Sequence, residues 1–76
     1  MSKGYHYKGK NLSTLILAKI EHIASLIAER EEKSFECAYR KFIESRTYQT
    51  LSDTQTLLWG ESAEYIVDDY YRESVD

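Results

Sequence analysis

The sequence predicts a small all-α domain, a bundle of three main helices plus one short helix. It contains no proline and only three glycines, and these two residue types interrupt helices most strongly. Residues 12–32 are apolar at helical spacing and form the only stretch long enough to organise a core. A chain of 76 residues has room for one core, which at this size is only just sufficient for stability.

The predicted first helix, residues 12–32, carries an apolar ridge. On a helical wheel of about 100° per residue, five side chains spaced three or four apart lie within about 40° of one another: Leu12, Ile16, Ile20, Ile23 and Ile27. Either Asn11 or Ser13 can cap this helix, because either side chain can accept a hydrogen bond from an amide of the first turn. The charged run 29–33 predicts its end.

The apolar surface of this helix is wider than one neighbour can cover. Leu15 and Leu26 flank the ridge on one side, and Leu17 and Ala28 flank it on the other. The apolar arc covers roughly 200°, whereas a surface helix needs about 100°. We therefore expect one shoulder, either Leu15 with Leu26 or Leu17 with Ala28, to be an interface. A homodimer about a two-fold axis or a different protein partner could occupy it.

A second helix is predicted to begin after Ser34, whose hydroxyl can cap it. Its inward face consists of residues at spacings of three and four: Phe35, Ala38, Tyr39, Phe42 and Ile43. Residues 46–51 are predicted to be a polar connection from which Tyr48 and Leu51 point inward.

A short helix is predicted at residues 53–59, and the last helix at residues 63–74. Ser52 and Gln55 match the capping box of the short helix, and Gly60 can end it because glycine adopts positive φ freely. Trp59 is interpreted as a packing residue. Ser62 can cap the last helix, whose predicted inward face is Ala63, Ile66, Val67 and Tyr70.

Charge is distributed unevenly along the chain. Residues 1–50 contain nine Lys and Arg against six Asp and Glu, a net +3, whereas residues 51–76 contain one against seven, a net −6. Residues 1–10 mix lysines with aromatic residues without apolar periodicity, and they are predicted to be a flexible arm preceding a helical domain at residues 11–76. An acidic segment repels phosphate, so nucleic acid is not the expected partner. A small nucleic-acid-binding regulator using the basic N-terminal half is kept as the alternative function.

No catalytic, cofactor-binding or metal-binding motif is present, so the chain is not expected to be an enzyme or to need a cofactor. Cys37 has no histidine or second cysteine placed to activate it and is interpreted as an ordinary helix residue. Asp68, Asp69 and Glu73 lie on a helix rather than in a calcium-binding loop, and they are interpreted as a solvated acidic face. The single cysteine, the absence of a secretion signal and the charged residues within the first helix predict a cytoplasmic protein with no membrane-spanning helix.

The arrangement from Leu12 onward resembles a family of short bacterial helical proteins of unknown function, about seventy residues long and often encoded beside ADP-ribosyltransferase-like toxins. The resemblance rests on the apolar first helix, on residues 34–39 (SFECAY), on Leu58 and on residues 64–69 (EYIVDD). The family usually has a histidine where this chain has Trp59. No functional residue is carried over, and the resemblance implies a compact protein-interaction module, an antitoxin or accessory subunit.

Overall fold

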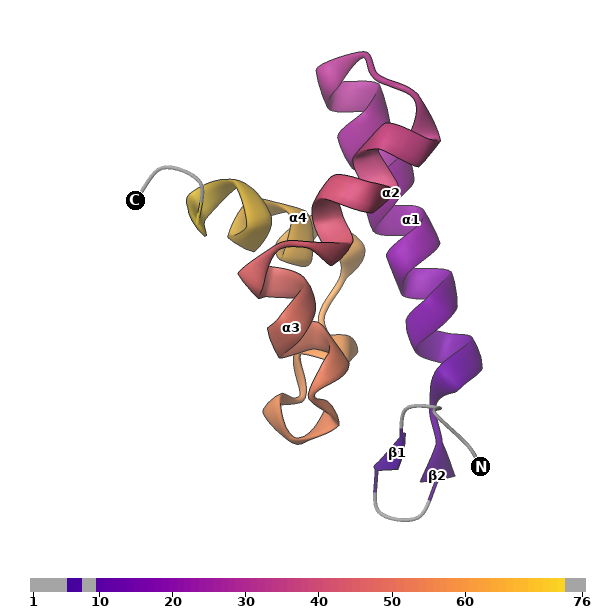
Figure 1. Cartoon of the computed structure of the whole chain (residues 1–76). Coiled ribbons are helices and arrows are strands. Elements are labelled where there is room, and N and C mark those ends of the chain that lie inside the picture. The colour runs from indigo at the N-terminus through magenta and orange to yellow at the C-terminus, as the bar shows by residue number, and fades with distance from the viewer. Residues whose placement is uncertain (1–5, 8–9, 74–76) are drawn as a thin grey trace.

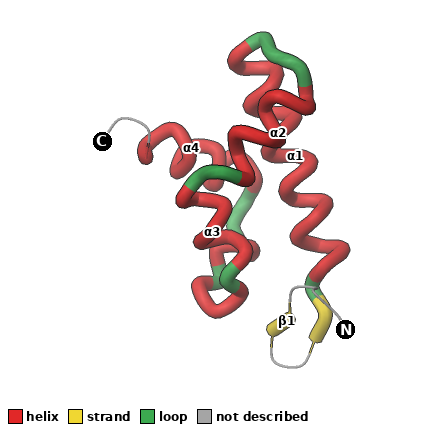
Figure 2. The backbone as a smooth tube through the Cα atoms, in the orientation of Figure 1, coloured by secondary structure: helices red, strands yellow, loops and turns green. Residues whose placement is uncertain are grey.

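The longest element is α1 (Ser13–Glu31), and the other helices lie to one side of it (Figure 1). It is followed along the chain by α2 (Phe35–Ile43), α3 (Arg46–Ser52) and α4 (Ala63–Glu73). This computed structural model describes residues 6–7 and 10–73, and Figure 2 shows that short loops separate the helices. The predicted all-α fold is confirmed, although the short helix is not where the sequence placed it.

The apolar ridge of α1 forms the centre of the core. Ile16, Ile23 and Ile27 are completely buried, and Ile20 is nearly so. They form one cluster with apolar side chains from the rest of the chain: Ala38, Phe42, Leu51, Leu58, Ala63, Ile66 and Val67. The helical spacing located the ridge correctly, because residues three and four apart share one side of a helix whatever packs against them.

Both ends of α1 differ in detail from the prediction. Leu12 occupies the N-cap position, without a side-chain capping bond in the described part of the chain, so neither Asn11 nor Ser13 is the N-cap residue. At the other end, Glu32 adopts the left-handed conformation, with φ 54° and ψ 48°. The backbone N–H groups of Glu32 and of the following residue both donate to the Ala28 carbonyl. Glycine usually makes this ending.

The start of α2 agrees with the prediction, whereas one residue of its inward face does not. Ser34 is the N-cap, and its Oγ accepts a hydrogen bond from the Cys37 N–H at 3.2 Å. Phe35 is 46% exposed and stacks on Tyr39, with ring centroids 6.0 Å apart. Phe35 is the first residue of α2 and, unlike Tyr39, does not pack against the core cluster. The other predicted inward residues are buried or half-buried.

The predicted polar connection at residues 46–51 is wrong, because these residues form helix α3. Ser45 is its N-cap, and the Ser45 Oγ accepts a hydrogen bond from the Tyr48 N–H at 3.1 Å. Leu51 is completely buried, as predicted. A helix of this length gains little from intrinsic propensity and depends on caps and tertiary packing, which a periodicity analysis does not detect.

The predicted helix at residues 53–59 is also wrong. The chain instead forms two 3-10 turns, η1 (Thr54–Thr56) and η2 (Leu58–Gly60). Asp53 caps the first turn, with its Oδ1 accepting a hydrogen bond from the Gln55 N–H at 3.1 Å. The expected capping box does not form, because its serine already belongs to α3.

Leu57, rather than Gly60, adopts the left-handed conformation in this segment. Its φ is 63°, whereas the φ of Gly60 is not left-handed. The chain therefore changes direction between the two turns. Leu58 is buried and Trp59 packs against the core, and the Trp59 Nε1 donates to the Thr54 carbonyl at 2.9 Å. The interpretation of Trp59 as a packing residue is confirmed.

Helix α4 agrees with the prediction over its described length. The Ser62 Oγ accepts a hydrogen bond from the Tyr65 N–H at 3.1 Å, as expected for the cap. The predicted inward residues are buried, except that Tyr70 is half-buried, with its ring centroid 5.7 Å from that of Phe42. The predicted end at Ser74 lies outside the described residues.

Two residue pairs before α1 form a short antiparallel ladder. Strands β1 (His6–Tyr7) and β2 (Lys10–Asn11) pair in the register His6↔Asn11 and Tyr7↔Lys10, and β1 lies beside η1. No alternation of apolar and polar residues predicted this pairing. The remaining residues of the predicted arm, 1–5 and 8–9, lie outside the described residues, so its flexibility stays a prediction.

Candidate interaction surface

The four predicted interface residues differ in exposure according to their position along α1. Leu15 and Leu17, in the N-terminal half, are 46% and 49% exposed. Leu26 and Ala28, in the C-terminal half, are half-buried and pack against the core. Each predicted shoulder therefore combines one exposed residue with one packed residue.

The difference in exposure follows from helix length. At a rise of 1.5 Å per residue, the 19 residues of α1 extend about 29 Å, and the 9 residues of α2 about 14 Å. Helix α2 folds back from the C-terminal end of α1 (Figure 1), so it covers only about half of α1. We call residues 14–18 the open segment of α1, in which every residue except Ile16 is exposed.

A hydrogen bond joins α1 to the beginning of α4 beside the open segment. Lys19 Nζ donates to the Glu61 carbonyl at 2.7 Å, across 42 residues of sequence. Leu15 lies one turn before Lys19 on the same side of α1, because residues four apart share a face. In the first turn of α4, Tyr65 is 47% exposed.

Acidic side chains lie near Tyr65 in the sequence of α4 and of the residues before it. Glu61, Glu64 and Asp68 are all exposed, and Asp68, three residues after Tyr65, shares its side of the helix. Within the described residues, none of the three carboxylates forms an ion pair. Tyr65 is thus an exposed aromatic ring among negative charges.

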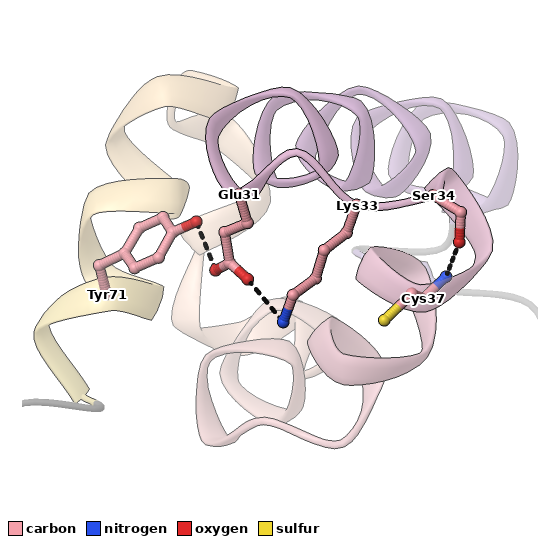
Figure 3. Close-up of polar contacts among 5 residues, drawn as sticks. All are labelled: Glu31, Lys33, Ser34, Cys37 and Tyr71. Atoms are coloured by element: carbon pink, nitrogen blue, oxygen red, sulfur yellow. Dashed lines mark hydrogen bonds and ion pairs between the residues drawn. The ribbon is translucent and has the colours of Figure 1, made fainter.

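A separate polar cluster connects α4 to the end of α1 (Figure 3). Tyr71 Oη donates to a carboxylate oxygen of Glu31 at 2.7 Å, and Lys33 Nζ lies 3.3 Å from the other oxygen. The guanidinium carbon of Arg30 lies 4.9 Å from the centroid of the Tyr71 ring, within the range of a cation–π contact. These contacts hold the second half of α4 against α1 and the α1–α2 turn.

The pKa shifts of Glu31 and Tyr71 indicate that this cluster has a structural rather than a catalytic role. The hydrogen bond from Tyr71 lowers the pKa of Glu31, and Lys33 lowers it further by a hydrogen bond and its charge. Burial, and then the hydrogen bond to Glu31, raise the pKa of Tyr71 to about 12. Both shifts move the pKa further from 7, so neither group is suited to proton transfer near neutral pH.

Glu73 does not belong to a solvated acidic face, contrary to the prediction for Asp68, Asp69 and Glu73. Its carboxylate accepts hydrogen bonds from the backbone N–H groups of Arg46 at 3.1 Å and Thr47 at 2.8 Å, and from the Thr47 hydroxyl. Burial raises the pKa of Glu73, but these hydrogen bonds outweigh it and lower the pKa overall. Asp69 pairs with Arg72 at 3.3 Å, and of the three only Asp68 is classed as exposed rather than half-buried. Among the described residues, no group of three potential ligands could hold a metal ion.

The exposed face of α2 carries charges of both signs. Cys37 is exposed there. A groove on this face is lined by Ser34, Glu36, Cys37, Arg40, Lys41 and Glu44. Its two basic residues are accompanied by two acidic residues, so the groove does not present the uniformly positive surface that phosphate backbones require.

In comparisons with known proteins, no family model, curated protein or solved structure matches the chain. The resemblance to the toxin-associated family therefore stays a hypothesis. In the part of the chain that the structure describes, no helix combines the length and apolar character needed to cross a bilayer.

The sequence analysis missed Tyr65 and Lys19 as surface residues. A signal for Tyr65 was present, because this aromatic residue lies out of phase with the inward positions of its helix. For Lys19 there was none, since its partner is a backbone carbonyl distant in sequence.

Proposed function

We propose that this chain is a small helical protein-interaction module, an antitoxin-like or accessory subunit, which binds its partner through the open segment of α1. The observation that supports this most directly is the exposure of Leu15 and Leu17 on either side of the completely buried Ile16. They lie on opposite shoulders of the same turn of α1, and an exposed large apolar side chain on either shoulder can contribute to an interface.

The rigidity of the open segment also supports this function. Its backbone belongs to α1, whose ridge is anchored in the core. A surface fixed before binding loses little conformational entropy on association. The exposed leucines could therefore bind a partner without first being ordered.

The antitoxin-like role rests on sequence resemblance at Leu58 and residues 64–69. A toxin-like protein encoded beside this chain would be the first partner to test. A second copy of the chain is the other candidate, because two-fold dimers are the commonest soluble oligomers.

The experiment compares the variants Leu15→Ser and Leu17→Ser with the matched control Leu57→Ser, a leucine that is also 49% exposed but lies between η1 and η2. Each variant should change the free energy of unfolding by no more than about 1 kcal/mol. Binding to the neighbouring toxin-like protein, measured by calorimetry, or self-association, measured by sedimentation, should weaken at least tenfold only for the two α1 variants.

Three outcomes would contradict the proposed function. The wild-type chain could stay monomeric at high micromolar concentration and bind no protein from its own cells. Leu57→Ser could weaken binding as much as the α1 variants do. Alternatively, the α1 variants could unfold, which would mean that Leu15 and Leu17 support the core.

A further inference from the structure

A small cavity lies between α3 and α4, and we call it the α3–α4 cavity. Its volume is about 210 Å³. Drug-sized ligands occupy pockets of about 300–1,000 Å³, so this cavity could hold only a smaller molecule. Its lining comes from α3, from η2 and from α4: Arg46, Thr47, Thr50, Leu58, Asp69 and Glu73.

The two helices bring charges of opposite sign to this cavity. Helix α3 contributes Arg46, and α4 contributes Asp69 and Glu73, which share one face because they are four residues apart. Burial raises the pKa of Glu73, whereas its hydrogen bonds and then the charge of Arg46 lower it, so the guanidinium lies within electrostatic reach of this carboxylate. Among the described residues, however, the Arg46 guanidinium forms neither an ion pair nor a hydrogen bond. Opposite charges therefore line one cavity without a direct bond between them.

Both carboxylates can accept further hydrogen bonds. A carboxylate has about four acceptor positions on its two oxygens. Glu73 Oε1 accepts from the backbone N–H and the hydroxyl of Thr47, and Oε2 accepts only from the N–H of Arg46, so one position on Oε2 remains. Asp69 pairs with Arg72, whose side chain is 69% exposed, and exposed pairs of this kind are weak.

We infer that the α3–α4 cavity binds a free amino acid or another small zwitterion. Arg46 would bind the carboxylate, because a guanidinium presents paired N–H donors that match its two oxygens. Asp69 and Glu73 would accept hydrogen bonds from the ammonium, and Leu58 offers an apolar contact for the carbon chain. A lone anion would meet the two carboxylates and a lone cation would meet the guanidinium, so only a molecule with both charges matches the whole lining.

The fold holds much of this site in place before a ligand binds. Glu73 is fixed by its three hydrogen bonds to the first turn of α3, and Leu58 belongs to the core cluster. Groups that are already ordered lose little conformational entropy on binding. The inference goes beyond the proposed function, because it uses no residue of the open segment of α1.

The experiment titrates the full, isotope-labelled chain with L-alanine and, separately, with γ-aminobutyrate, and follows backbone amide chemical shifts at constant ionic strength. Acetate and methylammonium carry one charge each and are the matched control ligands. For at least one zwitterion we expect saturable changes centred on residues 46–50 and 69–73 and on Leu58, with a Kd on the order of 1–10 mM. Both control ligands should bind at least tenfold more weakly.

Two variants each remove one charge from the cavity. Arg46→Gln deletes the guanidinium but keeps the backbone N–H that bonds to Glu73, and it should raise the Kd at least tenfold. Asp69→Asn should raise the Kd severalfold. The control Arg40→Gln removes an exposed arginine from α2 and should leave the Kd unchanged. Thermal melts verify that each variant is folded.

The inference is overturned if the shift changes stay linear in the concentration of both zwitterions, or if acetate or methylammonium binds as tightly as they do. It is also overturned if either Arg46→Gln or Asp69→Asn binds the zwitterion as tightly as Arg40→Gln does. Leu15→Ser and Leu17→Ser should leave the Kd for the zwitterion unchanged, so failure of this site and failure of the proposed function are distinguishable.

Discussion

Replacing Glu73 by glutamine should destabilise the domain through the start of α3, 26 residues away in sequence. The Glu73 carboxylate accepts bonds from two backbone N–H groups of the first turn of α3 and from the Thr47 hydroxyl. It therefore acts as an additional cap supplied by another helix. Loss of a capping side chain costs about 0.5–2 kcal/mol. Because Glu73 is only half-buried and glutamine can still accept one bond, we expect about 1 kcal/mol, after allowing for solvent screening.

Thermal unfolding followed by circular dichroism provides the measurement. In a domain of this size, 1 kcal/mol corresponds to a decrease in Tm of about 4–8 °C. In the folded protein, the pKa of Glu73 lies below its ordinary value of 4.5. The stabilisation is therefore complete above pH 4.5 and is lost as the pH falls through the lowered value. The difference in Tm between wild type and Glu73→Gln should be largest near pH 7 and should shrink in acid.

Asp68→Asn is the matched control, because it removes an exposed carboxylate from the same helix. The pKa of Glu31 is also lowered, so the pH dependence of Tm for one protein includes both carboxylates. The difference in Tm between wild type and Glu73→Gln isolates the contribution of Glu73. Amide hydrogen exchange at Arg46 and Thr47 should accelerate in Glu73→Gln alone. Equal Tm values for the two variants, or a difference that does not change with pH, would refute the capping role.

Four further predictions concern stability. Ile23→Ala should cost about 2–5 kcal/mol, because Ile23 is completely buried; a loss of under 1 kcal/mol in denaturant titration would contradict that burial. Glu32→Gly should raise the free energy of unfolding by about 0.5–1 kcal/mol, since glycine adopts the observed left-handed φ without strain, and a lower Tm would argue against that conformation. Gly60→Ala should be neutral or stabilising by up to about 1 kcal/mol, because an added Cβ meets no atom within 4 Å; marked destabilisation would indicate a contact there. Tyr71→Phe should cost about 1 kcal/mol by removing the hydrogen bond to Glu31, and an unchanged chemical denaturation midpoint would show that this bond is not stabilising.

Sequence correctly predicted the buried faces and N-caps that depend only on residues within one helix and its cap. The ridge of α1 and the inward residues of α4 are repeated at helical spacing, and Ser34 and Ser62 cap the helices that follow them. In each case the evidence lies within a few residues of chain. The same reasoning failed at α3, whose N-terminus depends partly on Glu73 from a distant helix.

The sequence by itself determined the helical class, the buried ridge and the wide apolar arc of α1, because helical periodicity is a local property. Only the tertiary structure decided which part of that arc stays exposed. Helix α2 folds back over about half the length of α1 from its C-terminal end, and Leu15 and Leu17 are exposed in the other half. The lengths and meeting points of helices depend on turns and long-range hydrogen bonds. The exposed part of α1 therefore could not be located from periodicity alone.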